Sequence, residues 1–288
     1  GGALLLLVYL LYRQSFGENY NKGAFFMSNY NKKIIRTASY IEIWEYEKPI
    51  FSKGKSTIYT NAENKEKSKR RTFDELTPEE QEQRLERMKK TRLEAKWNLL
   101  RLVDCNFDDT TSFLTLTTKE NISERNEFKD LLKTFIKRFN YHIFKTKKSQ
   151  LRYIAVLEKQ KRGAWHAHIL LFSVPYIPHR QLLELWGHGA VRINKVDVDS
   201  KENRGRYVTK YFEKGIGQEL LENFGKQAYL SSRNLKKPDE DKFYSYETFD
   251  YNSSTVLYET EYTSKVYKDG QYFDNHVTYK KIKLDTKE

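Results

Sequence analysis

Two histidines stand one residue apart at the start of a strand-like segment. His166 and His168 belong to GAWHAHILLF (163–172), which is otherwise mostly apolar. Since residues i and i+2 of a strand point to the same side, both imidazoles can present a ring nitrogen to one metal ion. Taken alone, such a pair is more typical of two half-exposed surface histidines. The residues around this pair are needed to distinguish a metal site from two surface histidines.

A third ligand is offered by the preceding segment. Glu158 stands near the end of the strand-like segment RYIAVLEK (152–159), and the turn-forming KQKRG separates it from the histidines. This pattern predicts a β-hairpin, in which facing residues lie about 5 Å apart. Two imidazoles and one carboxylate would bind a metal ion and leave positions open for a substrate oxygen. Without the histidines, Glu158 would be interpreted as a solvated carboxylate at a strand end.

A second group of chemically capable residues lies in RYVTKYFEKG (206–215). Tyr207 and Tyr211 are four residues apart on a predicted helix, with Lys210 on the same stripe. A phenolate there would be a nucleophile, and a nearby cation would favour its ionised form. The alternative is a pair of amphipathic tyrosines at the border of the hydrophobic face, in a chain that contains 21 tyrosines.

These residues fall on a regular alternation of predicted elements, β-α-β-β-α-β-α. Its strands are 111–118, 152–159, the segment after Gly163, and 190–198, and its helices are 124–144, Pro178–Trp186 and 205–215. The sequence therefore predicts an α+β fold with a split βαββαβ core and a central antiparallel sheet. Both helices of this core are expected on one face of the sheet, which would leave the other face free to bind a ligand.

Four regions are expected along the chain. Residues 1–60 are an N-terminal segment with possible strands, especially within 33–51, and 61–104 are a charged linker and a long helix capped by Thr77. The core domain is expected at 105–238. An acidic, β-rich extension occupies 239–288, where Asp269-Gly270 between alternating segments predicts a β-hairpin.

Composition narrows the class of partner. The chain has 288 residues, a formal net charge of +13 and 15% aromatic residues, which together favour single-stranded nucleic acid. A lysine-rich surface that serves only solubility would give a similar charge. The single cysteine, Cys105, excludes an internal disulfide framework and indicates a reducing cytoplasm. The apolar run GGALLLLVYLLY is too short to span a bilayer, so no membrane is expected.

Three motifs in order resemble the HUH endonucleases, in particular the rolling-circle replication initiators (Rep proteins) of bacterial plasmids and single-stranded DNA phages. FLTLTT (113–118) resembles the first motif, and HAH (166–168) fits the His-hydrophobic-His motif with a small middle residue. YVTKY (207–211) resembles the two-tyrosine form of the Tyr-x-x-Lys motif. The resemblance covers roughly residues 100–240, including SSRNLKKP (231–238).

The resemblance implies a specific chemistry. The protein would be a DNA endonuclease and strand transferase in which Glu158, His166 and His168 bind Mg²⁺ or Mn²⁺. Tyr207 would attack the scissile phosphate at an origin, leaving a 5′-phosphotyrosine link and a free 3′-OH primer. Lys210 would stabilise the developing charge, and Tyr211 would perform a second cleavage before the strand is rejoined.

The implied partners are single-stranded or hairpin origin DNA, a host helicase and a host DNA polymerase, in the cytoplasm of a bacterial host. A host helicase is expected because the sequence contains no GxxxxGK[ST] loop. Backbone contacts to DNA are predicted for lysines within and just after the 124–144 helix. These are Lys129, Lys133, Lys137, Lys145, Lys147 and Lys148. Such lysine rows are also common on plain solvated surfaces.

Two further interpretations remain open. A mobilisation relaxase or a transposase shares the metal and tyrosine chemistry, although a relaxase usually places its tyrosine before the histidine motif. A non-catalytic RNA-binding module can also have a βαββαβ sheet, but it stacks bases on aromatic residues of the central strands. His166 and His168 on one face favour a metal site instead.

Overall fold

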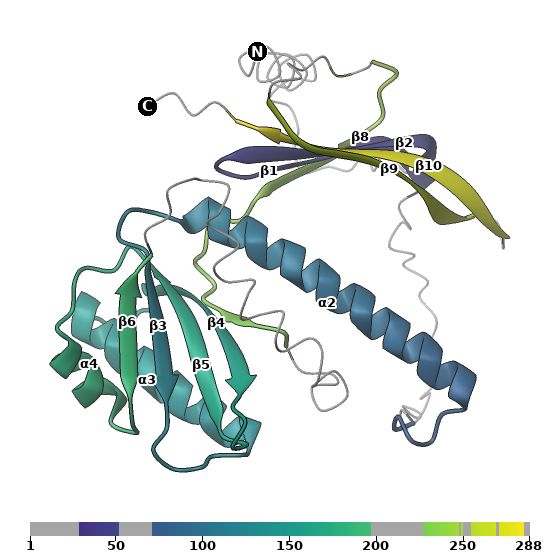
Figure 1. Ribbon diagram of the computed structural model, residues 1–288. Helices are drawn as coiled ribbons and strands as arrows, with labels where there is room; N and C mark the ends of the chain where they lie inside the picture. The colour runs from purple at the N-terminus through teal and green to yellow at the C-terminus, as the bar shows by residue number, and fades with distance from the viewer. Residues whose placement is uncertain are drawn as a thin grey trace, which may run out of the picture. The chain divides into compact units, whose positions relative to one another are not determined.

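The chain divides into two compact units. The computed structural model describes residues 29–51, 71–196, 227–247, 249, 255–268 and 271–284. The central unit is Arg70–Lys237, and the terminal unit combines Gly1–Lys69 with Pro238–Glu288. Figure 1 shows the elements of both units.

The central unit contains an antiparallel sheet with the strand order β6-β3-β5-β4-β7. Its strands are β3 (Ser112–Thr117), β4 (Arg152–Lys159), β5 (Trp165–Phe172), β6 (Val191–Lys195) and β7 (Leu230–Ser231). Its described helices are α2 (Pro78–Asn106), α3 (Arg125–Phe144) and α4 (His179–Trp186). The elements from β3 to β6 follow the predicted βαββαβ order, so the predicted α+β fold is confirmed. The predicted helix 205–215 lies outside the described residues.

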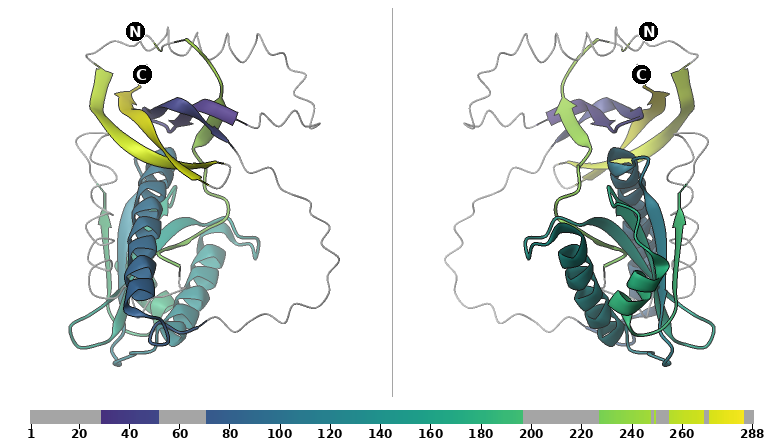
Figure 2. Two further views of the ribbon diagram at one scale, coloured as in Figure 1. Left: turned by 90° about the vertical axis from the view of Figure 1, so that its right-hand side faces the viewer. Right: turned by 90° about the vertical axis from the view of Figure 1, so that its left-hand side faces the viewer.

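One face of this sheet, termed here the helix face, is covered by α3 and α4 (Figures 1 and 2). Helix α3 repeats apolar residues with helical periodicity, which gives it one apolar side. Phe128, Phe135 and Phe139 of that side pack with Trp186 of α4 against odd-numbered residues of β5, such as Ile169. Each of these side chains is at most 1% exposed. Burying a side chain of this kind contributes roughly 1.5–3 kcal/mol, so this layer is the main core of the unit.

The opposite face, termed here the histidine face, carries the even-numbered residues of β5 and is partly covered by α2. Leu99 and Val103 in the last turns of α2 pack in one cluster with Leu170 and Phe172 of β5. The prediction that this face is free was therefore wrong for the half beside Leu170. Helical periodicity shows that a helix buries one side, but it does not show which surface that side covers.

Helix α2 begins where the sequence predicted. Thr77 accepts a hydrogen bond from the backbone of Glu80, whose side chain accepts one from the backbone of Thr77. This capping box, with Pro78 in the first turn, fixes the start of the helix. At its other end, Asn106 exchanges two hydrogen bonds with the backbone of Lys236. These contacts hold the chain segment after β7 against the end of α2.

The edge of the sheet beside the histidines requires a glycine. The backbone of His188 and Ala190 accepts hydrogen bonds from Lys119 and Thr117, which continues the pairing of β6 with β3. Gly189 between them has a φ of +153°, and a Cβ there would lie 2.4 Å from the carbonyl oxygen of Thr117. Only glycine allows this close approach of the two backbones.

The terminal unit is a second antiparallel sheet, with the order β8-β1-β2-β10-β9. Its strands are β1 (Asn29–Arg36), β2 (Tyr40–Phe51), β8 (Asp239–Phe243), β9 (Val256–Lys268) and β10 (Gln271–Lys283). The strands predicted within 33–51 and the antiparallel pairing across Asp269-Gly270 are present, although these two turn residues lie outside the described residues. Strands from both sequence ends of the chain thus complete one sheet.

Within the described ranges, no helix is both long enough and apolar enough to cross a lipid bilayer.

Candidate metal site on the histidine face

Glu158, His166 and His168 meet on the histidine face because of the register of the β4–β5 hairpin. Glu158 lies directly opposite His166, and Val156 lies opposite His168. Glu158 is therefore beside one histidine and diagonal to the other, within reach of both. The hairpin closes through hydrogen bonds between the backbones of Gln160 and Ala164 and of Gly163 and Gln160. The sequence prediction that this hairpin brings the three residues together agrees with the structure.

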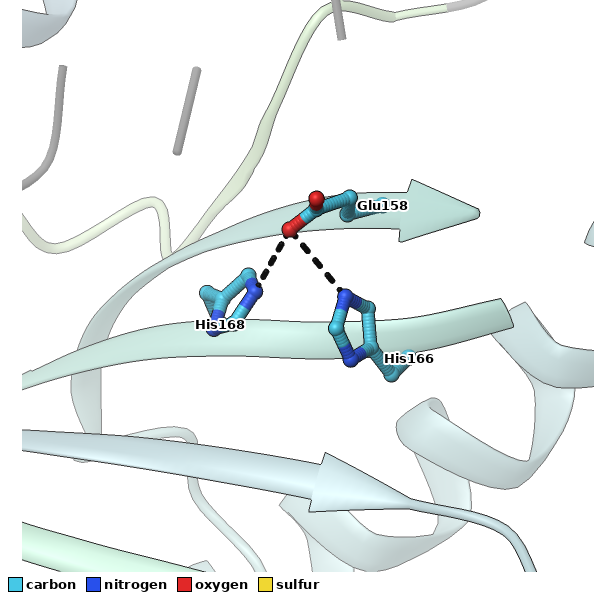
Figure 3. Close-up of side chains that lie close together, drawn as sticks. All are labelled: Glu158, His166 and His168. Atoms are coloured by element: carbon cyan, nitrogen blue, oxygen red, sulfur yellow. Dashed lines mark hydrogen bonds and ion pairs between the residues drawn. The ribbon is translucent and has the colours of Figure 1, made fainter. Parts of the chain in front are cut away.

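One carboxylate oxygen is the meeting point of the cluster (Figure 3). Oε2 of Glu158 accepts hydrogen bonds from Nε2 of His168 at 2.9 Å and from Nε2 of His166 at 3.1 Å. The ligand atoms of the three residues all lie within 4.8 Å of one another. The side chains of His168, His166 and Glu158 are 7%, 14% and 19% exposed, so the cluster is largely shielded while remaining accessible to solvent.

The other ring nitrogen of each histidine also has a neighbour. Nδ1 of His168 lies 3.3 Å from the hydroxyl of Thr115, and Nδ1 of His166 lies 3.4 Å from the side-chain amide of Gln160. The ring of His168 also stacks on Phe113, with 5.5 Å between the ring centroids. Such contacts fix the ring orientation of a metal-binding histidine. Neither Thr115 nor Gln160 was predicted from the sequence, although Thr115 belongs to the motif 113–118 and Gln160 to the turn KQKRG just before the histidines.

The electrostatics of the cluster favour an ionised Glu158. Burial alone would raise the pKa of this carboxyl, but hydrogen bonds from His168 and His166, together with their charge, hold its pKa below the usual range. A carboxylate and two imidazoles with converging atoms form the donor set that suits a divalent ion such as Mn²⁺, with room left for oxygen ligands. The ion would displace the protons that the two Nε2 atoms now donate. The residues present therefore fit a metal ion.

A cation also lies on this face. Arg192 of β6 is opposite Thr115, which in turn is opposite His168. The three residues form one row across neighbouring strands, so Arg192 points to the same side of the sheet as the histidines. Its side chain is exposed. Arg192 was not predicted from the sequence, because a single arginine on a predicted strand does not indicate which face of the sheet it occupies.

The predicted tyrosine motif lies outside the described residues. Tyr207, Lys210 and Tyr211 therefore stay predictions from the sequence. A different tyrosine, Tyr229, is described and packs against the cluster of the histidine face just before β7. Burial raises the pKa of its hydroxyl.

The lysines for which DNA contacts are predicted do not lie on the histidine face. Lys129, Lys133 and Lys137 belong to α3, which covers the helix face, on the other side of the sheet from Glu158. Lys133 pairs with Asp130 of its own helix at 2.7 Å. Lys145, Lys147 and Lys148 are exposed in the loop before β4, whereas Glu158 is near the far end of that strand. DNA binding by these six lysines stays a prediction.

One comparison with known proteins gives a match. Residues 111–216 match the sequence model of a family described as "Replication-associated protein ORF2/G2P". The matched segment contains Glu158, His166, His168 and the tyrosine motif. No curated protein and no solved structure matches the chain. The match supports a role in DNA replication as an initiator.

Proposed function

We propose that the protein is a rolling-circle replication initiator that nicks one DNA strand at an origin by metal-dependent tyrosine transesterification. The observation that carries this proposal is the convergence of Glu158, His166 and His168 on one point of the histidine face. The family match covers this cluster and the tyrosine motif together. Rolling-circle replication starts from a strand break with a free 3′-OH, and a metal site beside a nucleophilic tyrosine is suited to make it.

In the proposed reaction, the oxygen of Tyr207 attacks the phosphorus of the scissile phosphodiester. A bond forms between phosphorus and the tyrosine oxygen, the bond from phosphorus to the 3′ oxygen breaks, and the phenolic proton passes to solvent. The 3′ oxygen leaves as a hydroxyl, which a host polymerase extends. Attack by a later 3′-OH on the phosphotyrosine reverses these changes and rejoins the strand without ATP. Tyr211 serves as the second nucleophile, and host helicase unwinds the duplex.

The proposed metal ligands and their neighbours have separate roles in this reaction. Glu158, His166 and His168 would hold Mg²⁺ or Mn²⁺, and the bound ion would withdraw charge from the non-bridging oxygens of the phosphate. Thr115 and Gln160 keep the imidazole rings in orientation. Lys210 stabilises negative charge on the tyrosine or the phosphate.

The arrangement favours this enzyme over a non-catalytic RNA-binding sheet. Such a sheet presents aromatic residues on the central strands of an open face. Here, half of the corresponding face is covered by α2, and the other half presents His166, His168 and Glu158. A relaxase or transposase would use the same chemistry. The replication-associated family match favours an initiator instead.

The proposal is tested by trapping the covalent intermediate. Full-length protein is incubated with 5′- or 3′-labelled single-stranded origin DNA and Mn²⁺, and the products are separated by denaturing electrophoresis. We expect a protein–DNA adduct that retains the label on the 3′ side of the nick and is absent when EDTA is added. Adduct formation in EDTA would contradict the metal requirement. Cleavage that leaves no covalent adduct would contradict the tyrosine mechanism.

Replacing Glu158 tests the metal site apart from catalysis. Glu158→Gln keeps the size of the side chain but removes its charge, so we expect the concentration of Mn²⁺ at half-saturation to rise by about tenfold or more. The measurement is the loss of the free Mn²⁺ signal in electron paramagnetic resonance as protein is added. Glu120→Gln, which changes an exposed glutamate after β3, is the matched control and should titrate as the wild type does. An unchanged titration of Glu158→Gln would mean that Glu158 is not a ligand.

A further inference from the structure

Aromatic side chains gather on one face of the terminal unit's sheet. Residues that face each other across an antiparallel pair share a side of the sheet. Tyr46 faces Val277, Trp44 faces Tyr279, and Tyr279 faces Thr260. These pairs define one side of the sheet, termed here the aromatic face. The described large aromatic residues of this face are Tyr30, Tyr40, Trp44, Tyr46, Tyr258, Tyr262, Phe273 and Tyr279.

The aromatic rings form a continuous patch across β1, β2, β10 and β9. Ring centroids are 5.8 Å apart for Tyr30 and Tyr46, 5.0 Å for Trp44 and Tyr279, and 6.1 Å for Tyr258 and Tyr279. A hydrogen bond between Trp44 of β2 and Tyr262 of β9 links the patch across the intervening strand β10. The three ring pairs meet at interplanar angles of 82°, 51° and 54°, so these rings do not cover one another face to face.

Lysines stand among these rings. Lys242 lies over Tyr30, Lys33 lies over Trp44 at 5.0 Å, and Lys281 lies over Tyr40 at 3.7 Å. Lys283 shares this side because it faces Tyr40. Among the described side chains of this face, these four lysines outnumber the glutamates, which are Glu240 and Glu42. One of these, Glu240, pairs with Lys242 at 2.7 Å, and the other, Glu42, accepts a hydrogen bond from Tyr279. The aromatic face is therefore cationic.

Stabilisation of the sheet does not explain why aromatic side chains of this patch are exposed to solvent. The apolar core of the terminal unit lies on the other side, where Ile34, Ile41, Ile43 and Ile282 pack together. Cross-strand aromatic pairs do stabilise a sheet. Tyr40 of the aromatic face is buried, but Tyr258 and Tyr262 of the outermost strand are 56% and 42% exposed, and Phe273 is 45% exposed. Large, clustered and exposed aromatic residues of this kind mark an interaction surface.

We infer that the aromatic face binds single-stranded DNA by base stacking, which would give the protein a second DNA contact apart from the metal site. Unpaired bases stack on aromatic rings, and lysines between the rings neutralise the phosphates. In duplex DNA the bases are already stacked on one another, so they are not available to stack on these rings. The choice of DNA as the strand rests on the proposed function. The face itself belongs to the terminal unit and contains none of the proposed catalytic residues.

The test measures binding without chemistry. Full-length protein is titrated into a fluorescein-labelled single-stranded oligonucleotide of mixed sequence in EDTA, and fluorescence anisotropy is followed. Replacing Tyr258 and Tyr262 together by serine should raise Kd about tenfold or more, which is the range expected for the loss of base stacking on aromatic rings. Tyr272→Ser removes a more exposed tyrosine from the other side of the same hairpin and should leave Kd unchanged. Thermal unfolding followed by circular dichroism checks that each variant is folded.

A second variant keeps the inference testable if the double variant does not fold. Bases that stack on Trp44 should quench its fluorescence, so Trp44→Phe should lose most of the DNA-induced quenching while Kd changes less than about threefold, because a phenyl ring still stacks. Wild-type Kd for the double variant, equal weakening by Tyr272→Ser, or tighter binding of duplex DNA or of RNA would each overturn the inference.

The outcomes also separate the two proposals. Suppose that the wild type forms no adduct with Mn²⁺ but the double variant loses DNA binding in EDTA. The proposed nicking activity would then be contradicted, whereas DNA binding by the aromatic face would be supported.

Discussion

Tyr207→Phe is expected to abolish the first covalent adduct with origin DNA. Phenylalanine keeps the ring and its packing but has no oxygen to attack phosphorus, so adduct formation should fall on the order of a thousandfold or more. The measurement is the yield of labelled adduct with Mn²⁺ after denaturing electrophoresis. Binding of the uncleaved oligonucleotide in EDTA should remain within about threefold of the wild type. This would separate a lost nucleophile from a lost fold.

Tyr211→Phe is the matched variant. The two tyrosines are about one helical turn apart in the predicted helix, so either hydroxyl can serve the same phosphate after a modest shift. Tyr211→Phe should form the first adduct but release multimeric products in place of monomer circles. Peptide mapping of the wild-type adduct identifies the attacking residue. A DNA-linked peptide bonded at Tyr211, or at Tyr229 beside the histidine face, would reverse the assignment of Tyr207.

Removal of either metal-site histidine is expected to stop nicking while DNA binding persists. His166→Ala or His168→Ala deletes a ligand atom that lies within about 3 Å of Oε2 of Glu158, and the nicking rate should fall about a thousandfold. Affinity for the oligonucleotide should change little, because the basic surface and not the ion supplies most of it. Nicking rates and anisotropy Kd values on the same preparations test both parts.

His276→Ala provides the control for this pair. His276 lies in the terminal unit, 50% exposed and paired with Glu261, so its loss should leave the nicking rate unchanged. His168 is buried and stacks on Phe113, so thermal unfolding must show that its variant is folded. Full nicking by a double histidine variant would remove the case for a metal ion at this site.

The cluster of Glu158, His166 and His168 was predictable because it depends on local sequence. A short turn with Gly163 joins two strands, and because successive side chains of a strand point to opposite sides, His166 and His168 share one side with Glu158 across the hairpin. The helix start at Thr77 was predictable for the same reason, because its capping box lies within four consecutive residues. Both features are determined by residues that are close in sequence.

The features that the sequence did not reveal depend on distant segments. Strand β7 has two residues, too few to show an alternating pattern, and it joins the sheet by pairing with Ile154 and Ala155 of β4. The position of α2 over half of the histidine face depends on tertiary packing, which periodicity does not specify. The pairing of β1 with β8 also lacks a local signal. Asn31 and Ser245, which exchange hydrogen bonds beside that pair, are 214 positions apart.

That long-range pairing sets an order of assembly during synthesis. The strands β1 and β2 leave the ribosome first, but their sheet partners β8, β9 and β10 follow only after the whole central unit has been translated. Domains generally fold as units during translation, and contacts between distant residues form late. The unit with the cluster of Glu158, His166 and His168 can therefore fold before the aromatic face exists. A ribosome that stops within β8–β10 would release a chain with the candidate nicking site but without the proposed DNA-binding surface of the aromatic face.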